Sequence, residues 1–125
     1  MTDNTDHGIR FGRIAAMLGV RDMARAERFY VDLLGFSKVF ENGTPTGFMI
    51  LKRDGAELHL TRAPDYQAPA HNLAHLMVED AEALFRLLQR HDVRIIKGLR
   101  DKDYGLKAFV FADLDGNRID VGQPL

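Results

Sequence analysis

The chain has 125 residues, of which 17 are Lys or Arg and 18 are Asp or Glu, and it contains no cysteine. This balance of charge gives no general attraction to nucleic acid or to a membrane surface. The absence of cysteine excludes disulfides, thiolate metal sites and cysteine nucleophiles, and it fits a reducing compartment. No apolar run reaches membrane-spanning length, and the polar amino terminus does not resemble a signal sequence. The composition therefore predicts one cytoplasmic domain with a packed core.

The first half of the chain predicts one strand, one helix and three further strands. Residues 1–10 are mostly polar and are expected to form a flexible arm. Residues 13–20 predict a strand, although Gly19 interrupts it. Asp22 is a candidate N-cap for a helix with an apolar stripe, and Gly35 is placed to end that helix. Three short strands separated by glycines and Pro45 are expected at 36–41, 48–52 and 57–62.

The second half of the chain predicts the same order of elements. Residues 64–70 contain two prolines and no periodicity, so they are interpreted as the connector between the halves. A strand is expected at 73–78, and Asp80 is a candidate N-cap for a second amphipathic helix. The second strand of this half is expected at 93–96. The closing hairpin pairs strands at 108–111 and 119–121 around a turn at 113–117.

Two pairs of matching segments show that the chain is internally duplicated. Residues 54–60 read DGAELHL and residues 115–121 read DGNRIDV, without a gap between the matched positions. The motif V-x-D also occurs twice, at 20–22 and 78–80, in each case before a predicted helix. The sequence therefore predicts an α+β fold of two β-α-β-β-β modules within one domain. The modules are expected at residues 11–63 and 71–125.

This order of elements resembles the vicinal oxygen chelate superfamily, which includes glyoxalase I, extradiol dioxygenases, fosfomycin resistance enzymes and bleomycin resistance proteins. The resemblance rests on the two V-x-D motifs, on F-Y-x-x-x-L-G-F at 29–36 and on D-x-D-G-N at 113–117. It covers residues 11–124, nearly the whole chain. Membership implies that the two modules form a curved eight-stranded mixed sheet or half-barrel, paired in a homodimer.

Within the superfamily the chain is most similar to proteins of the bleomycin resistance type. The similar tail runs Y-G-L-K-A-F at 104–109 and G-Q-P at 122–124. Lys107 stands where these relatives usually have arginine, so the charge is kept and the planar fork of donors is lost. The resemblance implies two grooves lined by both chains of a dimer, with the arm or first strand crossing between them.

In metal-dependent members, the resemblance implies one ligand on the first strand and one on the fourth strand of each module. The corresponding positions hold Ala15 and His59 in the first module, and Leu73 and Asp120 in the second. Alanine and leucine cannot coordinate an ion, so no metal cofactor is expected. The alternative uses His75, two residues beyond Leu73 and on the same face of its strand. His59, His75 and Asp120 would then form a two-His-one-carboxylate site for Fe or Zn.

Without a metal, the cavity between the modules is expected to bind a small molecule through aromatic and apolar side chains. Tyr66 and Tyr104 are predicted as lid or stacking residues because they lie in loops, and Lys107 is predicted to hold the Tyr104 loop. Core packing is a competing explanation for each phenylalanine. The full set of candidate ligand-binding residues is Phe40, Phe48, Tyr66, Tyr104, Lys107 and Phe109.

Two functional hypotheses follow. The first is a non-catalytic homodimer that sequesters a planar or hydrophobic compound such as an antibiotic, with no nucleic acid or membrane partner. The alternative is a metal-dependent lyase or dioxygenase that uses His59, His75 and Asp120. No residue pattern predicts a nucleophile, so no catalytic residue is assigned. A flat cationic ligand is not favoured, because the net charge is only −1 and tryptophan is absent.

Overall fold

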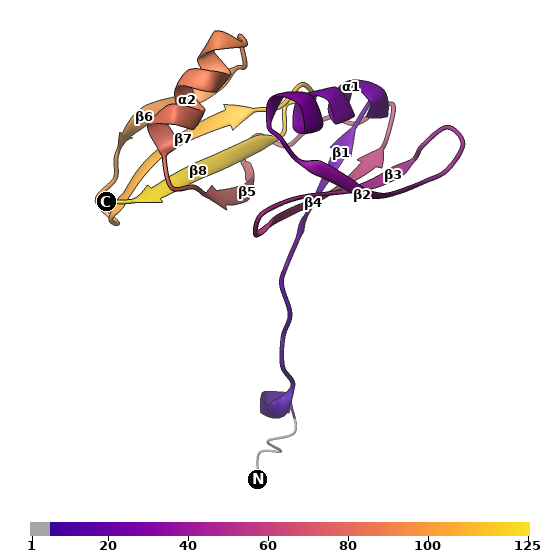
Figure 1. Ribbon diagram of the computed structural model, residues 1–125, viewed down its shortest axis with the longest axis horizontal. Coiled ribbons are helices and arrows are strands. Elements are labelled where there is room, and N and C mark those ends of the chain that lie inside the picture. The colour runs from indigo at the N-terminus through magenta and orange to yellow at the C-terminus, as the bar shows by residue number, and fades with distance from the viewer. Residues whose placement is uncertain (1–5) are drawn as a thin grey trace.

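The computed structural model describes residues 6–125 and contains two modules, each a four-stranded sheet with helices on one face (Figure 1). A short 3-10 turn, η1, covers Asp6–Gly8. The first module contains β1 (Ala16–Val20), α1 (Met23–Glu27), the π-helical η2 (Arg28–Leu33), β2 (Ser37–Asn42), β3 (Phe48–Arg53) and β4 (Ala56–Arg62). The second contains β5 (Asn72–Met77), α2 (Ala81–Arg90), β6 (Ile95–Asp101), β7 (Leu106–Ala112) and β8 (Arg118–Pro124).

The two sheets have the same topology, which confirms the predicted duplication. Strand order is β1-β4-β3-β2 in the first sheet and β5-β8-β7-β6 in the second. The first and last strands of each module pair in parallel, and the other pairs are antiparallel. The predicted α+β fold is thus confirmed. The eight strands are divided between two sheets, and neither sheet closes on itself.

Local sequence signals account for the helix ends. The Asp22 carboxylate accepts a hydrogen bond from the backbone N–H of Arg25 at 3.1 Å, and Asp80 accepts one from Ala83 at 3.0 Å. Both aspartates are therefore N-caps, as expected. Gly35 follows the first helical segment with φ of +75°, a conformation in which a side chain would be strained. These residues fix where each helix begins or ends before it packs on its sheet.

Several strand boundaries differ from the sequence-based expectation, among them the start of β1 and the end of β6. β1 begins at Ala16 instead of residue 13, because its pairing with β4 begins with Ala16 opposite Leu58. β6 continues to Asp101 instead of ending at residue 96, because Arg100 and Asp101 still pair with β7. Pairing partners set both ends, and the apolar pattern alone does not reveal them.

The core lies between the helices and the sheet faces they cover. In the second module, Phe85 of α2 packs against Phe109 of β7 with ring centroids 5.2 Å apart. Phe111 of β7 reaches across to Phe29 of η2, at 6.5 Å, so the two modules share one core. The opposite face of each sheet carries no helix (Figure 1), and it is called the open face below.

A buried polar network at the turn before β8 joins the two modules. Asp113 in this turn is buried, and it accepts a hydrogen bond from the Tyr30 hydroxyl of η2 at 2.6 Å. Burial of the hydroxyl, followed by the nearby Asp113 charge, raises the pKa of Tyr30 well above its usual value. Asn117 is fully buried, and its amide donates to the Gly19 carbonyl of β1 at 2.9 Å. The turn therefore fastens the second module to the first.

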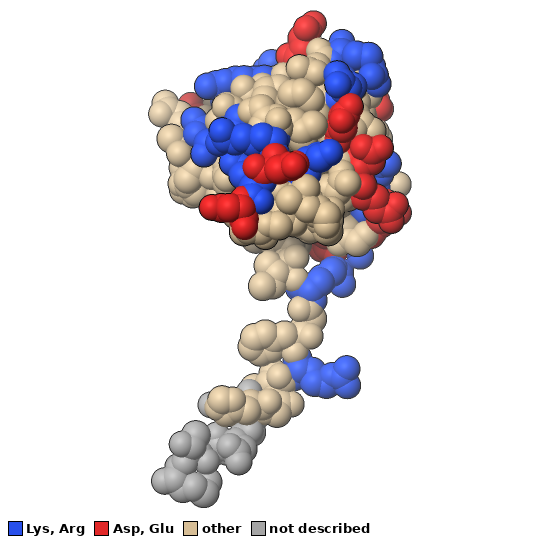
Figure 2. Space-filling view, turned by 90° about the vertical axis from the view of Figure 1, so that its left-hand side faces the viewer, with Lys and Arg blue, Asp and Glu red and all other residues tan. Residues whose placement is uncertain are grey.

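The chain before β1, residues 6–15, extends away from the folded body (Figures 1 and 2), and this segment is called the arm below. Its apolar side chains are exposed, with exposed fractions of 90% for Phe11 and 95% for Ile14. Of the arm expected over residues 1–10, residues 1–5 lie outside the described part of the chain. Among residues 6–125, no helix has the length and apolar character needed to cross a membrane.

Candidate functional site

Equivalent rows of side chains cross the open faces of the two sheets. In the first sheet the register aligns Met17, His59, Ile50 and Phe40 across β1, β4, β3 and β2. In the second it aligns His75, Asp120, Val110 and Lys97 across β5, β8, β7 and β6. Equivalent positions of the two modules therefore carry different side chains: the row is mostly apolar and aromatic in the first sheet, and mostly polar and charged in the second.

The open face of the first sheet is aromatic. Phe48 lies edge-on to both Phe40 and His59, with ring centroids 6.2 Å and 5.6 Å away, so three rings cross β2, β3 and β4. Phe40 is 47% exposed and Met17, at the end of the row, is 68% exposed. An apolar patch of this kind on a sheet face is typical of a surface that another molecule covers.

Glu57 organises the polar edge of this face. Its carboxylate pairs with the Nε2 atom of His59 at 2.7 Å, with Lys52 at 3.5 Å and with Arg13 from the arm. Hydrogen bonds from His59 and Arg13 lower the pKa of Glu57 to about 2, so the carboxylate stays ionised. His59 is therefore fixed in orientation by a carboxylate of its own strand.

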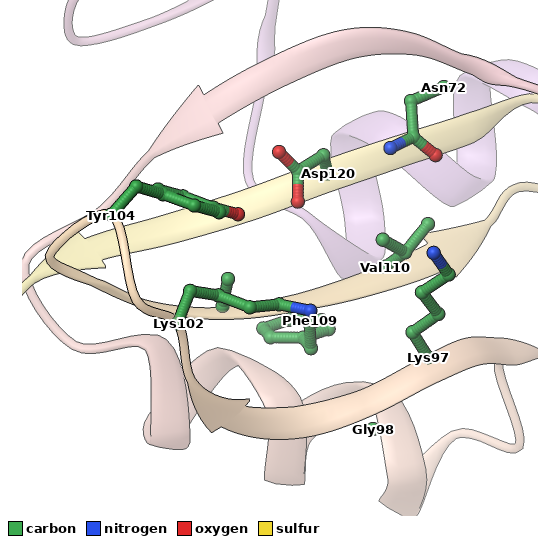
Figure 3. A pocket seen from close by; sticks show the side chains of 9 residues that line it. Asn72, Lys97, Gly98, Lys102, Tyr104, Phe109, Val110 and Asp120 are labelled. Atoms are coloured by element: carbon green, nitrogen blue, oxygen red, sulfur yellow. The ribbon is translucent and has the colours of Figure 1, made fainter.

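The open face of the second sheet is polar and contains a small pocket. The Nδ1 atom of His75 lies 2.7 Å from an Asp120 oxygen, and its Nε2 atom lies 3.0 Å from the Met77 sulfur. Beside this pair is a hollow of about 90 Å³ over β7 (Figure 3). It is lined by Asn72, Lys97, Gly98, Lys102, Tyr104, Ala108, Phe109, Val110 and Asp120.

The structure places the predicted ligand-binding residues at three different locations. Phe40 and Phe48 lie together on the open face of the first sheet. Tyr104 and Phe109 line the pocket of the second sheet, and the ring of Phe109 also packs in the core on Phe85. Tyr66 lies at the junction of the modules, where its hydroxyl donates to Asn117 at 2.6 Å. Burial of that hydroxyl raises the pKa of Tyr66.

Lys107 is not among the residues that line this pocket. It lies two residues before Phe109 on β7, so strand alternation places it on the face that carries α2. The turn that presents Tyr104 is closed by backbone hydrogen bonds, from Lys102 N–H to the Leu106 carbonyl at 2.7 Å and from Gly105 N–H to the Lys102 carbonyl at 3.2 Å. The predicted role of Lys107 in holding this turn stays a prediction.

Of the three candidate metal ligands, the structure brings His75 and Asp120 into contact. His59 lies in the other sheet, paired with Glu57. Ala15 precedes β1, and Leu73 packs against the core. Within residues 6–125 no group of three or more His, Asp or Glu side chains is placed to hold a metal ion. The donors of one chain therefore do not fit the metal site of metal-dependent relatives.

Sequence reasoning did not identify Asn72, Lys97 or Lys102 as site residues. The second strand of the second module was expected to end at residue 96, which placed Lys97 outside the sheet. The strand pairing shows why Lys97 belongs to the site. Asp120 of β8 pairs with Val110 of β7, and Val110 pairs with Lys97 once β6 is extended, so the three side chains share one face of the sheet.

Residues 10–121 match the model of the family described as Glyoxalase/Bleomycin resistance protein/Dioxygenase superfamily. A search of curated proteins found none that matches. Among solved structures, a member of this superfamily from Sphaerobacter thermophilus DSM 20745 is 25% identical with a TM-score of 0.73, covering 89% of this chain and 97% of that one.

Two further structures share the fold. A bleomycin resistance determinant encoded on the transposon Tn5 has a TM-score of 0.77 and 23% identity, covering 91% of this chain and 98% of its own. A bleomycin-binding protein complexed with bleomycin has a TM-score of 0.76 and 22% identity, covering 92% of this chain and 100% of its own. Both similarities extend over both modules.

Proposed function

Because the chain belongs to the Glyoxalase/Bleomycin resistance protein/Dioxygenase superfamily, we propose that it binds a small molecule and sequesters it without altering it. The observation that carries the proposal is the aromatic row of Phe40, Phe48 and His59, exposed on a sheet face that no helix covers. Aromatic walls with a few placed polar groups are typical of ligand sites. The bleomycin-binding protein with this fold supports the proposal, because it is complexed with bleomycin.

The proposed binding unit is a homodimer. Each open face is a surface of one sheet only, so a second copy would be needed to enclose a ligand on it. The arm supports this arrangement, because its Phe11 and Ile14 side chains are almost fully exposed. Figure 2 shows the arm extending beyond the folded body. Large apolar side chains on an extended segment gain stability when they pack on another chain. The grooves of the dimer would then be lined by both copies.

The second candidate is a metal-dependent lyase or dioxygenase, favoured by the contact between His75 and Asp120. In a dimer, His59 from the partner copy would be the third ligand. In this role the three side chains would hold Fe or Zn, which would polarise the oxygens of a substrate. This candidate requires the partner's imidazole to approach the His75–Asp120 pair, so it depends on the same dimer as the first.

Native mass spectrometry of untagged protein, purified without chelator, tests both candidates at once. We expect a dimer that retains an organic small molecule, or accepts one from a compound library, without a stoichiometric divalent ion. A divalent ion at one per chain, lost in both His59→Ala and Asp120→Ala, would replace the binding proposal with the enzyme. A ligand recovered chemically changed after incubation would contradict sequestration.

Substitution of the arm tests the dimer itself. Phe11→Asp combined with Ile14→Asp is expected to weaken dimerisation roughly tenfold or more, because two carboxylates would have to be buried at an apolar contact. Sedimentation velocity over a concentration series gives the dissociation constant. The matched control is Ala24→Asp combined with Ala83→Asp, since both alanines are exposed in the first turns of helices. Equal dissociation constants for the two double variants would exclude the arm from the interface.

A further inference from the structure

We propose that the bound compound carries an anionic oxygen group, and that Lys97 and Lys102 bind this group in the pocket on the open face of the second sheet. The inference rests on the proposed binding function and adds the chemical class of the ligand. It concerns carboxylates, phosphates and sulfonates alike, because their oxygens accept the same hydrogen bonds.

The polar side chains around the pocket point into one shared space. Figure 3 shows the amino groups of Lys97 and Lys102 and the hydroxyl of Tyr104 pointing into the space above β7. The amide of Asn72 is directed to the same space from β5. Lysine and tyrosine donate hydrogen bonds here, and asparagine donates through its amide nitrogen. Donors that converge from β5, β6 and the turn between β6 and β7 suit a ligand that offers only acceptors.

The floor of the pocket leaves room for a carboxylate or phosphate group. Ala108 and Val110 form the floor and are buried, and Gly98 of β6 adds no side chain at the wall. A carboxylate or phosphate group is compatible with a volume of about 90 Å³. The pocket is too small for a whole aromatic compound, so the remainder of the ligand would extend out of it.

The charges around the pocket also favour an anion. Among residues 6–125, neither Lys97 nor Lys102 forms an ion pair, although nine such pairs occur elsewhere. Asp120 is the one carboxylate among the nine lining residues, and it is already hydrogen-bonded to His75. Two cations without a carboxylate partner face a single paired anion. An oxyanion would complete this arrangement with charge-assisted hydrogen bonds.

In the proposed dimer, the two open faces would be chemically complementary parts of one ligand site. The first sheet offers aromatic rings at Phe40 and Phe48, and the second offers the lysine pocket at the matching position of the repeat. A compound with an aromatic or apolar body and one anionic group would use both. This class differs from a flat cationic drug, which would require carboxylates where this pocket has lysines.

Two fluorescent probes that differ in one group test the inference on the intact protein. Anilinonaphthalene sulfonate carries an anionic group, whereas N-phenyl-naphthylamine has the same rings and no charge. We expect both to bind, the sulfonate about tenfold more tightly. In Lys97→Met combined with Lys102→Met, the sulfonate is expected to lose that advantage while the neutral probe binds as before. Arg86→Met combined with Arg90→Met is the matched control, since it removes two exposed cations from α2 on the other side of the sheet, and it should change neither affinity.

The outcomes separate the two proposals. If the neutral probe binds and the sulfonate binds no more tightly, the anion site is wrong and the binding function stands. If neither probe binds, both the proposed small-molecule binding and the proposed anion site are wrong. Thermal unfolding shows whether the double variant folds. Independently of any variant, raising the salt concentration should weaken binding of the sulfonate alone, and an equal response of both probes would overturn the inference.

Discussion

Replacing Asn117 with alanine is expected to lower the free energy of unfolding by about 3 kcal/mol. The side chain is fully buried, and its amide donates at 2.9 Å both to the Gly19 carbonyl and to the Asp113 carboxylate. Its oxygen accepts from Tyr66 at 2.6 Å. Alanine would leave those three groups without this partner in a region that water reaches poorly, and each unmade bond is destabilising. Urea denaturation followed by circular dichroism measures the change.

The control is Asn42→Ala in β2, where the same amide is removed from an exposed position. That variant is expected to stay within about 0.5 kcal/mol of the parent protein. A domain of this size is stable by only about 5–15 kcal/mol, so the loss at Asn117 should be large enough to lower the unfolding temperature visibly. Similar losses at the two positions would show that the network between the modules contributes little.

The fold could be predicted because its signals are short-range or repeated. Asp22 and Asp80 bond to backbone N–H groups three residues away, so each N-cap is visible within one turn of sequence. The second copy of the module then confirmed the first, because an identical order of elements is improbable without a shared fold. Strand ends were less accurate, since they depend on partners distant in the sequence.

The turn before β8 was predicted from the sequence, but its contacts with the first module were not. The D-x-D-G-N motif predicted a hairpin turn, and the turn is present with Gly116 at φ of +85°. The same motif also supplies the side chains that join the modules. Tyr30 and Asp113 are 83 residues apart, and Gly19 and Asn117 are 98 apart. A local sequence pattern cannot predict these two hydrogen bonds, because they form only when one module packs on the other.

The candidate site was partly predictable for a similar reason. Alternation along a strand predicts which residues share a face. The internal repeat aligns His59 with Asp120, so these two residues were expected at equivalent positions. The register across strands then decides the neighbours, and it placed Met17 opposite His59 and His75 opposite Asp120. The lysine pocket required one further fact, the full length of β6. Without it, Lys97 could not be assigned to a face.

Gly19 and Tyr66 are in contact in the structure, and this contact explains both residues. The sequence presented Gly19 as an interruption of a strand and Tyr66 as a loop aromatic. A Cβ atom built on Gly19 would lie 2.3 Å from the Tyr66 ring, far inside van der Waals contact. The ring therefore packs directly on the backbone of β1, and this packing accounts for a large aromatic side chain in the connector without a ligand.

Gly19→Ala is consequently expected to destabilise the protein by about 2–3 kcal/mol, because the methyl group would displace the Tyr66 ring. In a Tyr66→Ala background the ring is absent, and the same substitution should become neutral or stabilise by up to about 0.5–1 kcal/mol, since alanine restricts the unfolded chain. Urea denaturation of the parent, both single variants and the double variant completes the cycle. Both substitutions test the same contact, so a loss of similar size in the two backgrounds would show that Gly19 is required for another reason.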